Sequence, residues 1–279
     1  MTTLLRLAAP LLALVAGCSA GPDALTTSAS SPAGAFDQEH TLLDGLLARH
    51  ARPAGVDYLG LAAEAAELDR YLASLHAVTP DELAGWSRDQ RFAFWINTYN
   101  AHILRLIIDH ADELPASIKD LGGALVNRIW DQPLIPMDAH HPSGTPGPLS
   151  LNDVEHEVLR PRFADARLHA AINCASVSCP PLLPEAFRAA TLEEQLERAM
   201  TDFVGDPSRN AFDRDAGRLR LSAIFDWFPE DFEADEGSVR AYARRYAPAA
   251  ARGDDDGAWI EAAKVGFLDY DWNLNDAPR

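Results

Sequence analysis

Two cysteines and a histidine lie close together in the middle of the chain, in a segment of small residues. His169 precedes Cys174 and Cys179, and Ser176 and Ser178 lie between the two thiols. A thiolate becomes a good nucleophile when a cationic or imidazole group lowers its pKa and a third group orients that partner. The segment therefore predicts a thiol and imidazole site, with Cys174 as the nucleophile and His169 as the general base. Its reaction would be acyl transfer or hydrolysis, of an amide or a thioester.

The same two cysteines have other interpretations, which the sequence leaves open. In an oxidising compartment an even pair is expected to form a disulfide, here Cys174–Cys179. Closing so short a loop gains only about 2 kcal/mol of chain entropy, so the bond would stiffen a turn. The protein would then be a non-catalytic binding or assembly module. Dithiol exchange is the third interpretation, and it is disfavoured because there is no Cys-x-x-Cys motif.

Further polar residues could support the thiol. Asn97, Tyr99 and Asn100 belong to a strongly apolar helical segment, and a buried carboxamide left unpaired costs roughly 1–3 kcal/mol. The two asparagines are therefore either internal staples or groups that orient an imidazole and donate to an oxyanion. Glu155 and His156 are either a helix cap and a surface residue, or they supply an acid–base pair or metal ligands together with His169. In the thiol and imidazole site, Glu155 or His156 would be the orienting group.

Neither a metal nor a cofactor is expected. The sequence has no HExxH motif and no paired-cysteine spacing. It also lacks a Walker loop, a GxGxxG motif and a GxSxG motif, which disfavours nucleotide-dependent and α/β-hydrolase chemistry. The aromatic residues at 227–228 and 270–272 are expected to contribute to packing.

Helices must position most of these residues. Hydrophobic periodicity predicts a long, largely buried helix over residues 88–110, because apolar residues occur on more than one of its faces. Further helices are expected over residues 36–50, 59–75, 153–159, 191–204 and 238–251, the fourth opened by a capping box and the third by an Asn-x-x-Glu cap. Residues 168–173 and 265–270 are predicted strands, residues 210–221 a hairpin, and residues 125–147 an irregular region. The fold class is therefore α+β, a mainly helical single domain with a small sheet.

The N-terminus resembles the export signal of bacterial lipoproteins. Arg6 is followed by an apolar stretch, and the run Val-Ala-Gly before Cys18 is similar to a lipobox. We expect a signal peptide over residues 1–17, a lipidated Cys18 with a flexible tether over residues 18–35, and one globular domain over residues 36–279. The tether would span roughly 23 Å. By the same resemblance, Ser19 predicts the periplasmic face of the outer membrane, with the lipid bilayer as a partner.

The charge of the chain limits its other partners. Lys and Arg number 24 against 42 Asp and Glu, a formal net charge of −18. Such a surface repels phosphate backbones, so nucleic-acid binding is not expected. The partner in the envelope would be a small molecule or a protein, and the sequence does not identify it.

Five ordered motifs resemble a known family. They are FWINTYNA at 94–101, LNDVEHEVLR at 151–160, HAAINCASVSCP at 169–180, LSAIF at 221–225 and YDWNLN at 270–275. Together they look like the "domain of unknown function 547" family, over roughly residues 36–276. The resemblance implies no established activity, although bacterial members are often exported and some eukaryotic relatives carry a glutaredoxin-like domain.

The pattern is also distantly similar to papain-like and transglutaminase-like folds. In those folds a helix packs on a sheet that bears the catalytic histidine, and the nucleophilic cysteine begins the helix. The helix at 88–110 has no cysteine. Under this analogy the thiol would have moved to Cys174, or the site would be inactive.

Overall fold

The computed structural model describes residues 35–122 and 128–278. The predicted signal peptide, the predicted lipidation site Cys18 and all but the last residue of the predicted tether lie outside these ranges. Residues Phe36–Arg279 form one compact unit. Within the described residues no helix is both long and apolar enough to cross a membrane.

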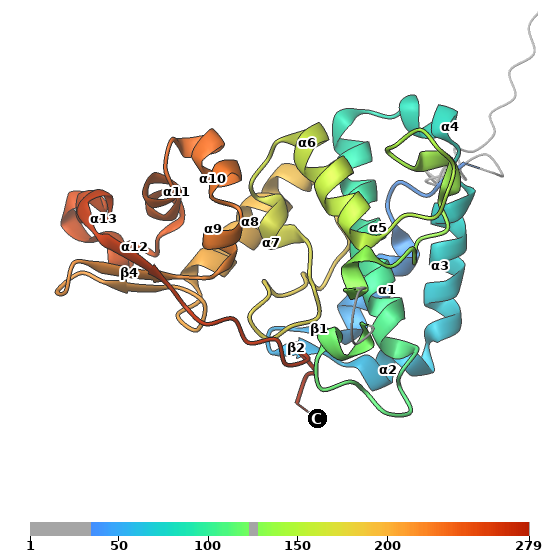
Figure 1. The fold of residues 1–279 in the computed structure, drawn as a ribbon, viewed down its shortest axis with the longest axis horizontal. Coiled ribbons are helices and arrows are strands. Elements are labelled where there is room, and N and C mark those ends of the chain that lie inside the picture. The colour runs from blue at the N-terminus through green and yellow to red at the C-terminus, as the bar shows by residue number, and fades with distance from the viewer. Residues whose placement is uncertain (1–34, 123–127, 279) are drawn as a thin grey trace, which may run out of the picture. The chain divides into compact units, whose positions relative to one another are not determined.

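Helices dominate this unit, which confirms the α+β, mainly helical prediction (Figure 1). The α-helices are α1 (Thr41–His50), α2 (Tyr58–Ala63), α3 (Ala65–Ala77), α4 (Pro80–Ala84), α5 (Arg88–Ile108), α6 (Arg160–Phe163), α7 (Leu168–Ala171), α8 (Leu192–Gly205), α9 (Ile224–Trp227), α10 (Pro229–Glu236), α11 (Val239–Tyr246), α12 (Ala249–Arg252) and α13 (Ala258–Ala262). Short 3-10 helices are η1 (Ile118–Leu121), η2 (Ile129–Asp131), η3 (Asp138–His140) and η5 (Gly253–Asp255), and η4 (Asp153–Leu159) is a π-helix.

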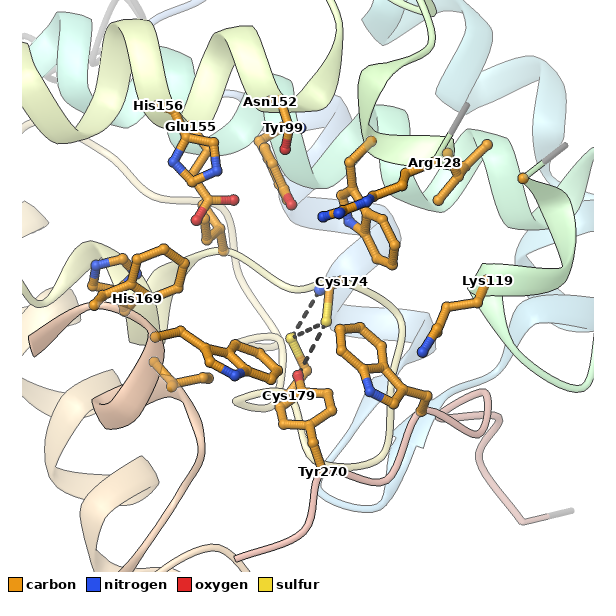
Figure 2. A pocket seen from close by; sticks show the side chains of 18 residues that line it. Tyr99, Lys119, Arg128, Asn152, Glu155, His156, His169, Cys174, Cys179 and Tyr270 are labelled. Atoms are coloured by element: carbon orange, nitrogen blue, oxygen red, sulfur yellow. Dashed lines mark hydrogen bonds between the residues drawn. The ribbon is translucent and has the colours of Figure 1, made fainter. Parts of the chain in front are cut away.

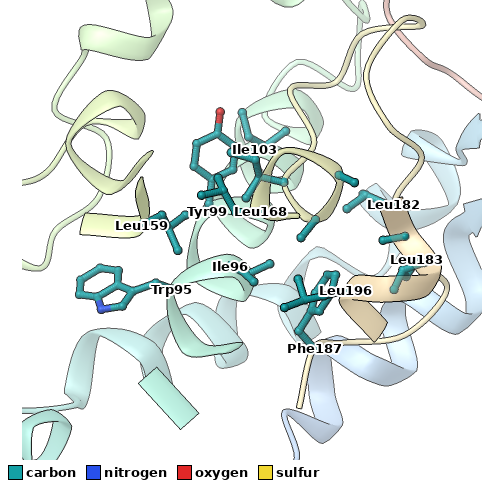
Figure 3. Packing of buried hydrophobic residues seen from close by; sticks show 14 of the residues in the cluster. Trp95, Ile96, Tyr99, Ile103, Leu159, Leu168, Leu182, Leu183, Phe187 and Leu196 are labelled. Atoms are coloured by element: carbon teal, nitrogen blue, oxygen red, sulfur yellow. The ribbon is translucent and has the colours of Figure 1, made fainter. Parts of the chain in front are cut away.

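Helix α5 forms the centre of the core, as its two apolar faces predict. It begins at Ser87, whose hydroxyl accepts from the backbone N–H of Gln90 while the Gln90 side chain accepts from that of Ser87. Every residue from Phe92 to Leu104 is buried. Helices α2 and α3 and the π-helix η4 pack against it, and side chains from residues 159–196 fill the space on the face shown in Figure 3. The polar residues of α5 are therefore held inside the protein.

Two small sheets complete the fold, one antiparallel and one mixed. Strands β1 (Ala51–Arg52) and β2 (Gly55–Val56) pair antiparallel. Strand β4 (Arg218–Leu221) pairs antiparallel with β3 (Ala211–Asp213) and parallel with β5 (Lys264–Phe267). The predicted hairpin and last strand are thus confirmed, the strand ending earlier than expected. The chain beyond β5 then returns to β2, where Val56 bridges Asp276 (Figure 1).

The predicted strand at 168–173 is wrong, because residues Leu168–Ala171 form helix α7. A short buried apolar run does not distinguish a strand from a helix by periodicity alone. Leucine and alanine favour the helix, and only Ile172 and the residue after it continue in extended form. His169 therefore lies on a helix, so the papain-like expectation of a histidine on a sheet is wrong as well.

Two predicted caps are also corrected. Thr191 precedes α8, but its side chain makes no cap and instead bonds the Gln195 side chain. Asn152 does not cap η4 either. Ser150 does, since its hydroxyl accepts from the N–H of Asp153, whose carboxylate accepts from the Ser150 N–H. Both helices are present all the same, because their buried apolar faces stabilise them. The predicted helices at 59–75 and 238–251 are each divided, into α2 with α3 and α11 with α12.

Candidate functional site

The two cysteines lie in a loop whose shape Asn173 determines. Its side-chain carbonyl accepts from the N–H of Ala175 at 2.7 Å, and its amide donates to the carbonyl of Pro180 at 2.7 Å. Ala175 has a positive φ of 59°, a conformation that costs a non-glycine residue energy and requires such support. The loop thus turns tightly between Cys174 and Cys179, which brings the two thiols together.

Two asparagines of α5 hold this region from beneath. Asn100 donates to the carbonyl of Ala171 at 2.9 Å and accepts from the N–H of Asn173 at 2.9 Å. Asn97 makes the same pair of bonds with the backbone N–H and carbonyl of Phe187. Both carboxamides therefore serve as backbone staples, and Asn100 fixes the chain directly before Cys174.

The C-terminal segment holds the cysteine loop from its other side. Val177 donates to the carbonyl of Asn273 at 2.9 Å, and Asn275 donates to the carbonyl of Ala175 at 3.1 Å. Arg209 adds bonds from its guanidinium to the carbonyls of Cys179 and Val177. Hydrogen bonds from three distant parts of the chain thus fix the position of the thiols.

The sulfurs of Cys174 and Cys179 lie 2.8 Å apart, and both residues are free cysteines. The Cys174 sulfur also lies 3.2 Å from the Tyr270 hydroxyl (Figure 2). It lies 3.6 Å from the hydroxyl of Ser176. The hydrogen bond with Cys179, together with those of Tyr270 and Ser176, outweighs the effect of burial and lowers the pKa of Cys174 from its ordinary value to about 7. Burial and the charge of Cys174 raise the pKa of Cys179 well above its ordinary value. Cys174 therefore has the lower pKa of the two thiols.

Both sulfurs line a cavity of about 740 Å³. One wall is aromatic: the ring of Trp272 lies 4.4 Å from that of Tyr270, 5.6 Å from that of Trp227 and 5.5 Å from that of Trp130. Trp227 is 41% exposed, although it lines the cavity. A concave, largely apolar space with a few convergent polar groups is the usual form of a small-molecule site.

The polar wall comes from the π-helix η4 and from α5. Glu155 and His156 belong to η4 and line the cavity with Tyr99 (Figure 2). π-Helical segments are rare and occur frequently at functional sites. Burial raises the pKa of Glu155 from 4.5 to about 7, and the negative charge of Cys174 adds to this, while a hydrogen bond with the Tyr99 hydroxyl opposes it. Glu155 is thus a carboxyl group that can give and take a proton near neutral pH.

His169 does not contact the Cys174 sulfur. Its Nε2 donates to the Asp231 carboxylate at 2.7 Å, and its ring stacks on Phe228 with centroids 4.4 Å apart. Burial lowers the pKa of His169 despite the neighbouring carboxylate. Burial also acts to raise the pKa of Asp231, but His169 and Arg160 outweigh it and hold the value at about 2. The histidine faces the cavity as one of its lining residues, but the expected hydrogen bond to the nucleophile is absent from the described structure.

His156 has a further neighbour. Arg160, one helical turn along, donates to its Nδ1 at 3.2 Å. Burial lowers the pKa of His156, and the charge of Arg160 lowers it further. His156 is therefore neutral at pH 7 and lines the cavity.

Several residues of the site were missed in the sequence. Tyr270 and Trp272 carry a motif that was interpreted as packing, and Asp231 and Arg160 gave no signal because they come from separate helices. Lys119 and Arg128 also line the cavity. The rarity of lysine in the sequence was a signal for Lys119 only, and no sequence pattern indicated Arg128.

No group of three or more His, Cys, Asp or Glu side chains is placed to hold a metal ion within residues 35–122 and 128–278. The fold and the site together define a mainly helical α+β domain with a dithiol at the base of an aromatic cavity.

Residues 83–204 match the model of the family described as "Protein of unknown function, DUF547". The match supports the resemblance over that stretch, which holds the α5 staples, Glu155, His156, His169 and both thiols. Two of the five motifs, at 221–225 and 270–275, lie beyond it. No curated protein and no solved structure matches the chain.

Proposed function

We propose that the protein is a thiol-dependent hydrolase or acyl transferase in which Cys174 is the nucleophile. The observation that carries the proposal is the environment of its sulfur, which faces the cavity between the Cys179 thiol at 2.8 Å and the Tyr270 hydroxyl at 3.2 Å. Two donors on one sulfur stabilise the thiolate, the reactive form of cysteine. Glu155 replaces His169 as the proposed proton-transfer group, because His169 donates to Asp231 instead.

The proposed reaction has two steps. The Cys174 thiolate attacks the acyl carbon of a thioester, ester or amide, and a carbon–sulfur bond forms as the carbonyl electron pair moves to oxygen. When that pair returns, the bond to the leaving group breaks and the leaving group takes the proton of the Glu155 carboxyl group. The Glu155 carboxylate then takes a proton from water or an acceptor, which attacks the enzyme thioester and releases Cys174 as a thiolate.

The pKa values near 7 of both groups support this scheme. At pH 7 each group is partly protonated, so the proposed active form with a Cys174 thiolate and a Glu155 carboxylic acid is populated. Activity should follow a bell-shaped dependence on pH with its maximum near 7. The network of His169, Asp231 and Arg160 would position Phe228 on the cavity wall, as the stacking of His169 and Arg160 on that ring indicates.

An activated ester tests the proposal without knowledge of the substrate. p-Nitrophenyl acetate should acetylate Cys174 in the reduced protein with a burst of p-nitrophenolate, located by peptide mass. Cys174→Ser should abolish the burst, and Glu155→Gln should slow release of the acetyl group. An acetyl group on Cys179 or elsewhere, or an unchanged burst in Cys174→Ser, would overturn the assignment.

A second function is favoured by the same 2.8 Å separation of the sulfurs. If Cys174 and Cys179 are oxidised to a disulfide in the protein's own compartment, the domain is a non-catalytic binding or assembly module whose ligand occupies the aromatic cavity. It would then show no alkylatable thiol before reduction. Dithiol exchange remains the least favoured function, since no Cys-x-x-Cys motif is present.

We also propose that the domain acts in the cell envelope, tethered through a lipidated Cys18 to the periplasmic face of the outer membrane. The sequence at residues 1–18 supports this. Labelling of cells with a fatty-acid analogue should modify the full chain and leave Cys18→Ser unmodified. Recovery of the labelled wild type in a cytosolic fraction would contradict the proposed location.

A further inference from the structure

Two cations line the cavity of a strongly acidic chain. Lys119, in η1, and Arg128, next to η2, project toward the cavity from the same side (Figure 2). Lysine is very rare in this sequence, and the other one is Lys264, in β5.

Neither cation is neutralised within the described residues. The ion pairs found there involve other arginines and histidines. Asp120, adjacent to Lys119, accepts from the backbone N–H of Ser117, and Asp131 in η2 accepts from the side-chain amide of Asn152. These two carboxylates are thus engaged with uncharged donors close to the cations.

The lysine is held in place by the aromatic wall. Its Nζ lies 4.6 Å from the ring centroid of Trp272, a cation–π contact. The rings of Tyr270 and Trp272 adjoin, and the Tyr270 hydroxyl contacts the Cys174 sulfur. A chain of direct contacts therefore connects the ammonium group with the thiol.

We propose that Lys119 and Arg128 form an anion subsite, so that the substrate carries a carboxylate or phosphate group beside the carbonyl that Cys174 attacks. This inference rests on the proposed function of Cys174 and names the chemical class of its substrate. Lysine and arginine bind such groups through charge-assisted hydrogen bonds. The aromatic wall would contact the apolar part of the same molecule.

Two alkylating agents of nearly equal size test the inference. Iodoacetate carries a carboxylate and iodoacetamide does not, and both form a carbon–sulfur bond with Cys174 and release iodide. In the reduced protein at pH 8 and low salt, the rate ratio of iodoacetate to iodoacetamide at Cys174 should exceed that at a free cysteine peptide by about fivefold or more, since the cations attract the carboxylate. Added salt should reduce the ratio.

Matched variants separate local from general charge effects. Lys119→Ala and Arg128→Ala should each lower the ratio of the iodoacetate rate to the iodoacetamide rate by roughly threefold. Lys264→Ala, which removes an exposed lysine from β5, should leave the ratio as it is. Protection of Cys174 from iodoacetamide by inorganic phosphate would identify a phosphate-bearing substrate, and protection by acetate a carboxylate.

The outcomes distinguish the two proposals. If Cys174 of the reduced wild-type protein reacts with neither reagent, it is not the nucleophile. A reactive Cys174 without preference for iodoacetate, or with equal losses in Lys119→Ala and Lys264→Ala, would refute the anion subsite alone.

Discussion

Replacement of Glu155 by glutamine should stabilise the protein at alkaline pH while it impairs turnover. Glutamine has the shape of the protonated carboxyl group, which is the form that the buried site favours. The folded pKa of Glu155 is about 7 against an ordinary value of 4.5. A folded pKa above the unfolded one means that stability is present below pH 4.5 and is lost as the pH rises through 7.

The size of the effect follows from these two values. Each pKa unit corresponds to 1.36 kcal/mol, so the raised pKa of Glu155 destabilises the folded state relative to the unfolded state by about 3 kcal/mol at pH 8 and about 1 kcal/mol at pH 5. Glu155→Gln removes this cost, and the free energy of unfolding should rise by about that amount at each pH. Urea denaturation at both values measures it.

Glu157→Gln is the matched control. It lies in the same π-helix η4 but is exposed, so its stability should differ from wild type by less than about 0.5 kcal/mol at both pH values. Equal effects of Glu155→Gln at pH 5 and pH 8, or a loss of stability at pH 8, would show that Glu155 is not a carboxyl group with a raised pKa.

Three further predictions concern the thiol and its support. Cys179→Ala should raise the pKa of Cys174 above 7, because alanine removes the hydrogen bond with the thiol at 2.8 Å, and thiol alkylation against pH measures it; an unchanged midpoint would contradict the contribution of Cys179. Asn100→Ala leaves two backbone groups beside the cysteine loop without a hydrogen bond. The free energy of unfolding, measured by urea denaturation, should fall by about 2–4 kcal/mol. A decrease below about 1 kcal/mol would show that these two hydrogen bonds are dispensable. Gly55 has a φ of 138°, and in Gly55→Ala the added Cβ would meet the backbone carbonyl of Asn275. Limited proteolysis should therefore cleave the C-terminal segment faster than in wild type. Equal cleavage rates would argue against the close approach of the Asn275 backbone to Gly55.

Much of the fold was predictable because it depends on local patterns. The apolar periodicity of residues 88–110 indicated a buried central helix, and the alternation around residues 210–221 indicated the hairpin; both are present. Helix α7 was missed because Leu168 and its neighbours form a short buried run in which both periodicities fit. The π-helix was predicted as an ordinary helix, since the pattern does not reveal a wider turn.

The site was predictable only in part. Cys174, Cys179 and Glu155 were identified from their residue types and spacing, and the structure places all three on one cavity. The partner of His169 was missed because Asp231 comes from a distant helix, α10. Tyr270 reaches the thiol through the returning C-terminal segment, and sequence distance gives no indication of that contact.

The most direct test of the central claim is the rate of alkylation of Cys174 and Cys179 by iodoacetamide as a function of pH, each located by peptide mass with and without prior reduction. The account predicts that Cys174 reacts first, with a midpoint at about pH 7, and that Cys179 remains slow because its pKa is raised. Two sulfurs that react only after reduction, or a Cys174 midpoint at the ordinary cysteine value of about 8.5, would contradict the nucleophile assignment.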